Sequence, residues 1–366
     1  MTRIPVRRIL VALVLLASPA AADGPALREA AARHAFDFGT AVSPAGADDA
    51  AYLDLVGKHF SIAVPEWGLY MTNVQPSPGV WDFSRADEVL HIAEQRDMKV
   101  HGHTLVWGLP LTAANPFGGW TPTPGWAHGG DLSRDTAIRV MTGYIETVMT
   151  RYRGRIREWV VVNEALSETA VDGMKLSPNI WLDRIGPDYV ALAFAHARKV
   201  VPDAILMIND WGVDYRGQNR ARVDDYYHLV ARLLDDGAPI DAVGFQFHLK
   251  VGRDTPTVAA IVDNMARYRK LGLSTHITEL DIRIPKPVTT EKLRERARLF
   301  AIVFRAAVES AVIDDVVMWG FTDRYSWITS GDTFPNDTAG VILDERLQPR
   351  PAFYAVQSEL ARDVRE

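Results

Sequence analysis

Short hydrophobic, β-branched runs alternate along the chain with longer amphipathic stretches. Eight runs have the composition of buried strands, namely Phe36–Val42, Phe60–Glu66, Lys99–Trp107, Glu158–Glu164, Ala204–Asp210, Ala242–His248, Thr275–Asp281 and Val316–Phe321. Stretches of helical period separate them, including Ala86–Arg96, Asp135–Tyr152, Tyr189–Val200, Ala221–Leu234, Val258–Leu271 and Thr290–Ser310. Such alternation is typical of a parallel sheet covered by helices, and eight units predict a single-domain α/β protein with the (β/α)8 barrel, or TIM barrel, fold. A doubly wound open sheet is the alternative, but no Gly-rich dinucleotide turn follows the first run.

The first 22 residues have the pattern of a secretory signal peptide. Basic residues, including Arg7 and Arg8, precede the apolar run Ile9–Ala17, which is too short to span a bilayer as a helix. Three alanines ending at Ala22 form a small-residue cleavage site. We therefore expect residues 1–22 to be removed and residues 23–366 to form the catalytic barrel domain. An uncleaved N-terminal anchor is the alternative.

Composition and charge narrow the class of protein. The chain contains no cysteine, which excludes disulfides, thiolate catalysis and cysteine-ligated metals. The ten histidines do not form a zinc pattern such as His-Glu-x-x-His, so we expect no metal and no cofactor. The net charge of −6 argues against nucleic acid or an anionic membrane as a partner. We expect a secreted or periplasmic monomer that has no membrane contact after cleavage.

Polar residues gather where the hydrophobic runs end. They are Glu66, His103, Trp107, Asn163, Glu164, Asn209, Asp210, Gln246, His248, Glu279, Asp281 and Trp319. In a barrel these carboxyl ends share one face, which is where active sites lie.

Two of the buried runs carry a glutamate near their ends, Glu164 and Glu279. A lone glutamate in this position is more often paired with an arginine. However, two buried carboxylates are costly unless they are paired or used, and glycoside hydrolysis requires two carboxyl groups facing one bond.

Six segments together resemble family 10 of the glycoside hydrolases. They are His101-Gly-His-Thr-Leu-Val-Trp107, Trp159-Val-Val-Val-Asn-Glu-Ala165, Ile208-Asn-Asp210, Gly244-Phe-Gln-Phe-His248, Ile277-Thr-Glu-Leu-Asp-Ile282 and Gly340–Tyr354. They occur in the family's order and cover the mature domain. The family is dominated by endo-β-1,4-xylanases, so the resemblance implies a polysaccharide substrate and a retaining double-displacement mechanism.

The resemblance also implies roles for individual residues. Glu164 would be the general acid/base and Glu279 the nucleophile, with carboxyl groups about 5–5.5 Å apart and a higher pKa for Glu164. Asn163 would bind the sugar 2-hydroxyl. His248 would hold Glu279 ionised, with Asp281 orienting its imidazole. On the same strand as His248, Gln246 would lie near the acid/base.

Further residues would bind substrate. They are Glu66, Trp67, Tyr70, His103, Trp107, Trp319 and Trp327. His103 could instead bridge strand ends, and the tryptophans could be core residues. By strand alternation we expect His101 and His276 to point away from the barrel lumen and to be structural.

The departures from the family concentrate after the second strand. The family usually has Glu-Asn followed by a lysine three residues after the asparagine, where this chain has Trp67 and Tyr70 after Glu66. The hydrogen-bonding residues of the second glycone sugar are thus replaced by flat, mostly apolar surface. A long irregular loop, Pro110–Gly130, could also wall off part of the cleft.

Three functions remain open at this point. The first is a secreted endo-β-1,4-glycanase, most simply a xylanase. The second keeps the mechanism but acts on a different or decorated polysaccharide, as the altered glycone region suggests. The third is a carbohydrate-binding protein without catalysis, which the retention of both glutamates disfavours.

Overall fold

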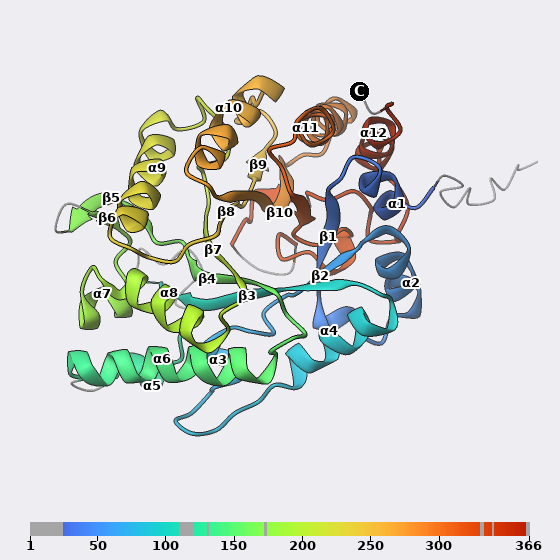
Figure 1. The fold of residues 1–366 in the computed structure, drawn as a ribbon. Helices are drawn as coiled ribbons and strands as arrows, with labels where there is room; N and C mark the ends of the chain where they lie inside the picture. Colours follow the sequence, from blue (N-terminus) through green and yellow to red (C-terminus); the bar gives the residue numbers. More distant parts are fainter. Residues whose placement is uncertain are drawn as a thin grey trace, which may run out of the picture.

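Eight parallel strands close into a barrel at the centre of the protein (Figure 1). The computed structural model describes residues 25–109, 120–129, 132–171, 174–329, 333–338 and 340–363. The barrel strands are β1 (Asp37–Val42), β2 (Ile62–Pro65), β3 (Lys99–Trp107), β4 (Glu158–Asn163), β7 (Ile205–Asp210), β8 (Ala242–Phe245), β10 (Ser274–Pro285) and β11 (Asp315–Met318). Each pairs in parallel with the next, and β11 pairs with both β10 and β1, which closes the ring.

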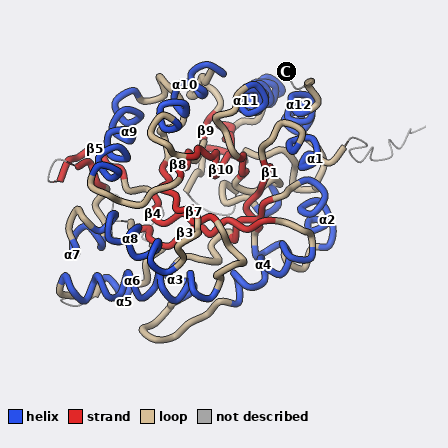
Figure 2. The backbone as a smooth tube through the Cα atoms, viewed as in Figure 1, coloured by secondary structure: helices blue, strands red, loops and turns tan. Residues whose placement is uncertain are grey.

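A ring of helices surrounds the strands (Figure 2). One main helix follows each barrel strand: α2 (Ala50–His59), α4 (Ser84–Gln95), α6 (Arg134–Arg151), α8 (Tyr189–Val200), α9 (Arg220–Asp235), α10 (Val258–Arg269), α11 (Thr290–Glu309) and α12 (Pro351–Leu360). Short helices and strands fill the connections: α1 (Leu27–Ala32), α3 (Met71–Val74), α5 (Gly125–His128), α7 (Ile180–Ile185), η1 (Pro44–Gly46), η2 (Asp323–Tyr325), the hairpin β5 (Leu166–Val171) and β6 (Met174–Leu176), β9 (His248–Lys250) and β12 (Asp337–Thr338). The predicted (β/α)8 barrel is confirmed.

The observed element bounds follow the hydrophobic pattern closely. The predicted bounds of β3 and α8 are those observed, and the other five predicted helices begin and end within two residues of the prediction. The sixth run differs, because β8 ends at Phe245 and His248 opens the separate strand β9. Between them Phe247 has a φ of 58°, outside the strand region. The seventh run continues beyond Asp281 to Pro285.

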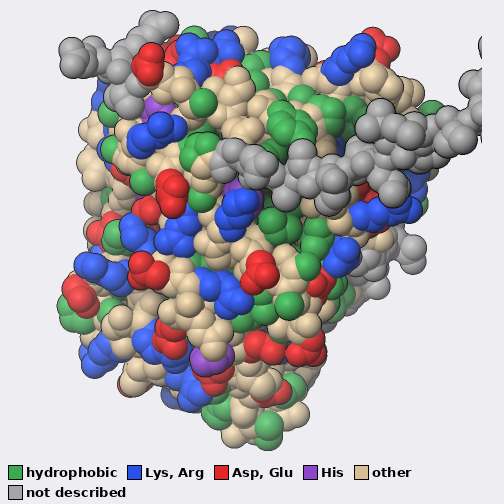
Figure 3. Space-filling model, turned by 90° about the vertical axis from the view of Figure 1, so that its right-hand side faces the viewer, with side chains coloured by type: hydrophobic (Ala, Val, Ile, Leu, Met, Phe, Trp, Pro, Cys, Tyr) green, Lys and Arg blue, Asp and Glu red, His purple; other side chains and the backbone are tan. Residues whose placement is uncertain are grey.

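Charges of both signs are mixed over the surface seen in Figure 3. Lys and Arg side chains lie among Asp and Glu side chains on this face, without a large patch of either sign. No helix within the described ranges is long and apolar enough to cross a membrane. The predicted signal peptide, residues 1–22, and residues 110–119 and 130 of the predicted loop lie outside the described residues.

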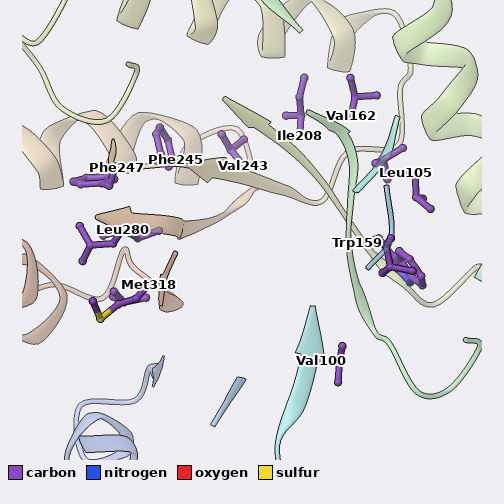
Figure 4. Packing of buried hydrophobic residues seen from close by; sticks show 14 of the residues in the cluster. Val100, Leu105, Trp159, Val162, Ile208, Val243, Phe245, Phe247, Leu280 and Met318 are labelled. Atoms are coloured by element: carbon purple, nitrogen blue, oxygen red, sulfur yellow. The ribbon is translucent and has the colours of Figure 1, made fainter. Parts of the chain in front are cut away.

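Outward-facing strand residues form the main core between barrel and helices (Figure 4). Val162, Ile208 and Phe245 come from three neighbouring strands, and each is at most 1% exposed. Alternate residues of a strand point to opposite faces, so these side chains meet the helices while their neighbours enter the lumen. Trp159 needs Gly102 on the adjacent strand, because a Cβ at Gly102 would lie 2.2 Å from the indole.

The middle of the lumen is apolar and its amino-terminal end is charged. Two clusters fill the middle, one of Ala41, Ile62, Val64, Val317 and Trp319 and one of Val160, Met207 and Ala242. Beneath them His101 Nε2 lies 2.8 Å from a Glu158 oxygen and 3.6 Å from Asp315 Oδ2. His276 Nδ1 lies 2.7 Å from the same Asp315 oxygen.

The expectation that His101 and His276 point away from the lumen is therefore wrong. β3 and β11 are separated in the sheet by β1 and β2, so His101 and Asp315 meet only across the lumen. His101 lies two residues before His103, on the same face of a strand. For His276, the pairing of β10 with β11 shifts between Ile277 and Leu280, so alternation counted back from Glu279 gives the wrong face.

Candidate active site

Glu164 and Glu279 line one large cleft at the carboxyl end of the barrel. The cleft has a volume of about 2040 Å³. Eleven of the predicted site residues line it: Trp67, Tyr70, His103, Trp107, Asn163, Glu164, Gln246, His248, Glu279, Trp319 and Trp327. Asp281 lies directly behind His248 and is fully buried. As the sequence predicts, the polar residues at the carboxyl ends of the strands lie on one face of the barrel.

Backbone irregularities orient the side chains of the cleft. Strand pairing shifts register between His103 and Val106 in β3, between Val160 and Val162 in β4, and between Ile277 and Leu280 in β10. Glu164, directly after β4, has a φ of 57°, a conformation that costs a non-glycine residue free energy. Such bulges and strained residues concentrate where a side chain must be re-aimed toward a site.

Glu279 is held as a carboxylate by three neighbours. Asn209 Nδ2 donates to Glu279 Oε1 at 2.7 Å, His248 Nε2 lies 3.2 Å from Oε2, and His103 Nδ1 lies 3.9 Å from Oε1. Burial alone would raise the pKa of Glu279, but the two histidines and the amide outweigh it and hold the pKa below its ordinary value.

His248 supplies the positive charge beside Glu279. Its Nδ1 lies 2.9 Å from Asp281 Oδ2, which also accepts a bond from Trp327 Nε1 at 2.9 Å. Burial opposes protonation, yet Asp281 and Glu279 together raise the pKa of His248 to about 10. Burial lowers the pKa of His103 below its ordinary value, so His248 is the more readily protonated of the two histidines beside Glu279. The predicted contacts of His248 with Glu279 and Asp281 are both present.

Among the described residues, the hydrogen-bond donors to Glu164 are both neutral. Gln246 Nε2 donates to its Oε1 at 3.1 Å and Trp107 Nε1 to its Oε2 at 3.1 Å. Burial, followed by the charges of Asp210 and Glu279, raises the pKa of Glu164 to about 7. The predicted order of the two pKa values is therefore the order in the structure, with Glu164 the weaker acid.

A chain of amides joins the two glutamates, and sequence reasoning missed the role of the member next to Glu279, Asn209. Asn209 Nδ2, which bonds Glu279, also donates to Asn163 Oδ1 at 2.8 Å, and Gln246 Nε2 lies 3.3 Å from that same oxygen. Thr278 Oγ1 donates to Asn209 Oδ1 at 2.7 Å, which fixes the orientation of this amide. The sequence signals for Asn209 are its place at a strand end and in the segment Ile208-Asn-Asp210, and neither specifies this contact. Because Asn163 uses its oxygen here, its Nδ2 is the donor left for a ligand in the cleft.

Aromatic side chains form the walls of the cleft. Tyr70, Trp107 and Leu109 pack together with the half-buried Trp67, and the Tyr70 ring lies 5.2 Å from that of Trp107. Trp319 stands 4.9 Å from the ring of His103, between the lumen and the cleft. These rings offer flat apolar faces of the kind that sugars stack on.

Glu66 is set apart from the other predicted substrate-binding residues. It is not among the residues that line the cleft, and it is only 3% exposed. Burial raises its pKa to about 7, although a hydrogen bond with Ser43 opposes this. Its placement in this structure is that of a buried group at the end of β2.

Several known proteins that are similar to this chain in sequence or in structure are xylanases. The chain is 34% identical over 360 residues to "Endo-1,4-beta-xylanase 1" of Humicola insolens, covering 97% of this chain and 78% of that protein. The crystal structure of native xylanase 10B from Thermotoga maritima matches with a TM-score of 0.81 and 31% identity, covering 92% of this chain and 98% of that one. Xylanase 10B from Thermotoga petrophila in complex with xylobiose matches with a TM-score of 0.83 and 28% identity, covering 93% and 99%.

The family assignment rests on the whole barrel rather than on isolated motifs. Residues 26–359 match the family description "Glycosyl hydrolase family 10", a range that runs from α1 into α12 and includes both glutamates. The protein belongs to glycosyl hydrolase family 10 and is a glycoside hydrolase.

Proposed function

We propose that the protein is a secreted endo-β-1,4-xylanase that cleaves internal bonds with retention of anomeric configuration. Glu279 attacks the anomeric carbon while Glu164 protonates the leaving oxygen, and Glu164 then activates the water that releases the glycosyl-enzyme. The observation that carries the proposal is the unequal environment of the two acids. One is held ionised by His248 and Asn209, and the other has a pKa of about 7 and so keeps a proton to give.

The amide chain supports a defined role for Asn163. Its Nδ2 is available to a sugar hydroxyl, and Asn209 couples it to the nucleophile. A donor fixed in this way strengthens its bond as charge develops on the sugar in the transition state.

The activity is tested with a panel of β-glycans and by the stereochemistry of the first product. We expect reducing ends to appear fastest from β-1,4-xylan, with a product of β configuration when the reaction is followed by NMR before mutarotation. Glu164→Ala should lose most activity on xylan but keep more on an aryl glycoside with a good leaving group, which needs little protonation. Added azide should then yield a β-glycosyl azide. An α-configured product would reject the retaining mechanism.

A second candidate substrate is a different or decorated β-glycan. Trp67 and Tyr70 favour it, because they give the cleft wall an apolar surface instead of hydrogen-bonding groups. Faster release of reducing ends from another polymer in the same panel would support this candidate over linear xylan.

The proposal includes export and a monomeric state. The expectation of export rests on the Arg-rich start, the apolar run and the three alanines before Asp23. N-terminal sequencing of the protein from the producing cells should begin at Asp23, and size-exclusion chromatography with light scattering should give the mass of one chain.

A further inference from the structure

Arg283 lies in the wall of the cleft, four residues beyond Glu279 on the same strand. It is 9% exposed and lines the cleft. Its guanidinium carbon is 3.8 Å from the centre of the Phe334 ring, which in turn packs edge-on against Trp327 at 5.0 Å. The stacking fixes the plane of the guanidinium beside the catalytic residues.

This guanidinium donates no hydrogen bond to any residue that the structure describes. Its Nε is buried without a partner, and the contact from its Nη1 to Asp337 Oδ2 is 3.9 Å, too long for a hydrogen bond. Burial lowers the pKa of Arg283 below its ordinary value. A buried charge is costly when its donors are unused, so the arrangement favours a ligand that brings acceptors.

The neighbouring carboxylates do not fill that role. Asp337 has a 2.8 Å contact with Lys250, and Asp254 a 2.7 Å contact with Arg253. Asp281 is engaged by His248 and Trp327. Each acid thus has a partner of its own at hydrogen-bond distance.

We propose that Arg283 binds the carboxylate of a uronic acid substituent on the β-glycan chain. The planar fork of an arginine matches a carboxylate bidentately, which gives both affinity and orientation. Arg283 is then a specificity-determining residue that favours acid-substituted chains over neutral ones. This rests on the proposed hydrolysis of a xylan-type glycan.

The test uses one polymer in two forms. Glucuronoxylan and the same preparation after reduction of its carboxyl groups to alcohols differ in charge but hardly in size. We expect the wild-type enzyme to have a roughly tenfold higher kcat/KM on the acidic form. Arg283→Gln should remove this preference. On the reduced polymer, which offers no carboxylate to Arg283, kcat/KM should stay within about twofold of the wild-type value. Arg283→Lys should keep part of the preference.

Arg85→Gln is the matched control, because Arg85 is another arginine lining the cleft and is exposed. It should change both substrates by the same factor. Equal loss on both polymers in Arg283→Gln, with an unchanged melting temperature, would mean that Arg283 serves as scaffold or binds hydroxyl groups, and would overturn the proposal.

A binding measurement separates this inference from the proposed function. An oligosaccharide bearing one glucuronic acid and its carboxyl-reduced form are titrated into the wild-type protein and into Arg283→Gln by calorimetry. Preference for the acidic form that disappears in the variant supports the site even if no xylan is cleaved. Equal affinity of the wild-type protein for both forms rejects the site even if xylan is a good substrate.

Discussion

The two ends of the barrel lumen hold the same kinds of side chain in opposite arrangements. At the amino-terminal end, His101 pairs with Glu158 at 2.8 Å and His276 with Asp315 at 2.7 Å. At the carboxyl end, His248 and His103 both lie beside Glu279. In the part of the chain that the structure describes, Glu164 accepts hydrogen bonds from two neutral donors, Gln246 and Trp107.

At the amino-terminal end of the lumen, called the lower end below, each histidine has its own carboxylate partner, and the result is a set of stable ion pairs. Burial opposes the charge on each group, but the carboxylates raise the pKa of His276 to about 9 and that of His101 above its ordinary value. Likewise burial would raise the pKa of Glu158, and the two histidines lower it to about 2. His276 and Glu158 therefore stay charged through the neutral range and have no proton to exchange there.

At the carboxyl end, called the upper end below, the histidines lie beside Glu279 and not beside Glu164, and this difference separates the pKa values of the two glutamates. Glu279 stays ionised, whereas the pKa of Glu164 reaches about 7. Environments that push two carboxyl groups apart in this way are what acid/base and nucleophile roles require. The difference teaches that the distribution of cations over the acids, rather than the presence of buried acids, supplies the chemistry.

The largest expected effect comes from removing one acid at each end. Glu279→Gln should lower kcat/KM on xylan by at least about a thousandfold, on the scale of losses when a covalent nucleophile is removed. Glu158→Gln should leave kcat/KM unchanged, because Glu158 lies at the far end of the lumen. Initial rates of both purified variants measure this. If Glu158→Gln lost activity to a similar degree at unchanged melting temperature, the two ends would not be functionally distinct.

A second contrast concerns the histidines. The wild-type kcat/KM should fall above pH 7 as Glu164 loses its proton, and at acidic pH as Glu279 gains one. His248→Asn removes the cation that stabilises ionised Glu279, so the pKa of Glu279 should rise and the acidic limb move up by about one to three pH units.

His276→Asn is the control for this measurement. His276 has no contact with either cleft glutamate, so the acidic limb should stay in place. A pH–rate profile for each variant decides the matter. An unshifted limb in His248→Asn would show that Asn209 and His103, rather than His248, set the ionisation of Glu279.

The sequence predicts the fold and the residues of the cleft better than it predicts the contacts at the lower end, for a physical reason. Hydrophobic runs predict strands and helices because burial imposes their period, and strand ends predict which residues share a face. The direction of a side chain near a β-bulge cannot be predicted from the hydrophobic pattern, which is why strand alternation predicts the wrong face for His276. Pairings across the lumen, such as His101 with Asp315, depend on the stagger of strands far apart in sequence. Asn209 lies in the segment Ile208-Asn-Asp210, but that segment does not specify which groups its amide binds, and its role appears only from its contacts.

Substitutions at the lower end should change the free energy of unfolding rather than the activity. The folded-state pKa of His276, about 9, lies above the ordinary 6.5, so its stabilisation is complete below pH 6.5 and is lost as pH rises through 9. The folded-state pKa of Glu158, about 2, lies below its ordinary value of 4.5. The stabilisation from Glu158 is therefore present above pH 4.5 and is lost as pH falls through 2. The pairs should therefore stabilise most between pH 4.5 and 6.5.

Denaturant unfolding of His276→Asn against wild type measures this contribution. At pH 6 the variant should be less stable by an amount on the order of 3 kcal/mol, since the buried Asp315 loses the nearer of its two histidine partners. At pH 10 the gap should shrink, because the wild-type histidine is then neutral. A gap independent of pH would mean that packing, and not the ion pair, is what the substitution removes.

The smallest expected effect lies at the rim of the upper end, where Trp67 and Tyr70 stand in the cleft wall. Trp67→Asn with Tyr70→Lys restores the hydrogen-bonding groups usual in the family. Each sugar hydrogen bond gained contributes about 0.5–1.5 kcal/mol, so kcat/KM on linear xylan should rise up to roughly tenfold and fall on a substituted chain. Tyr70 also packs against Trp107 and His103, so the alternative is that both aromatics support the wall and meet no sugar. Tyr70→Phe, which keeps the ring, is the control and should leave both substrates unchanged. If the double variant folds with an unchanged melting temperature yet loses activity on linear xylan, these aromatics are scaffold, and the upper end is specialised only around its two glutamates.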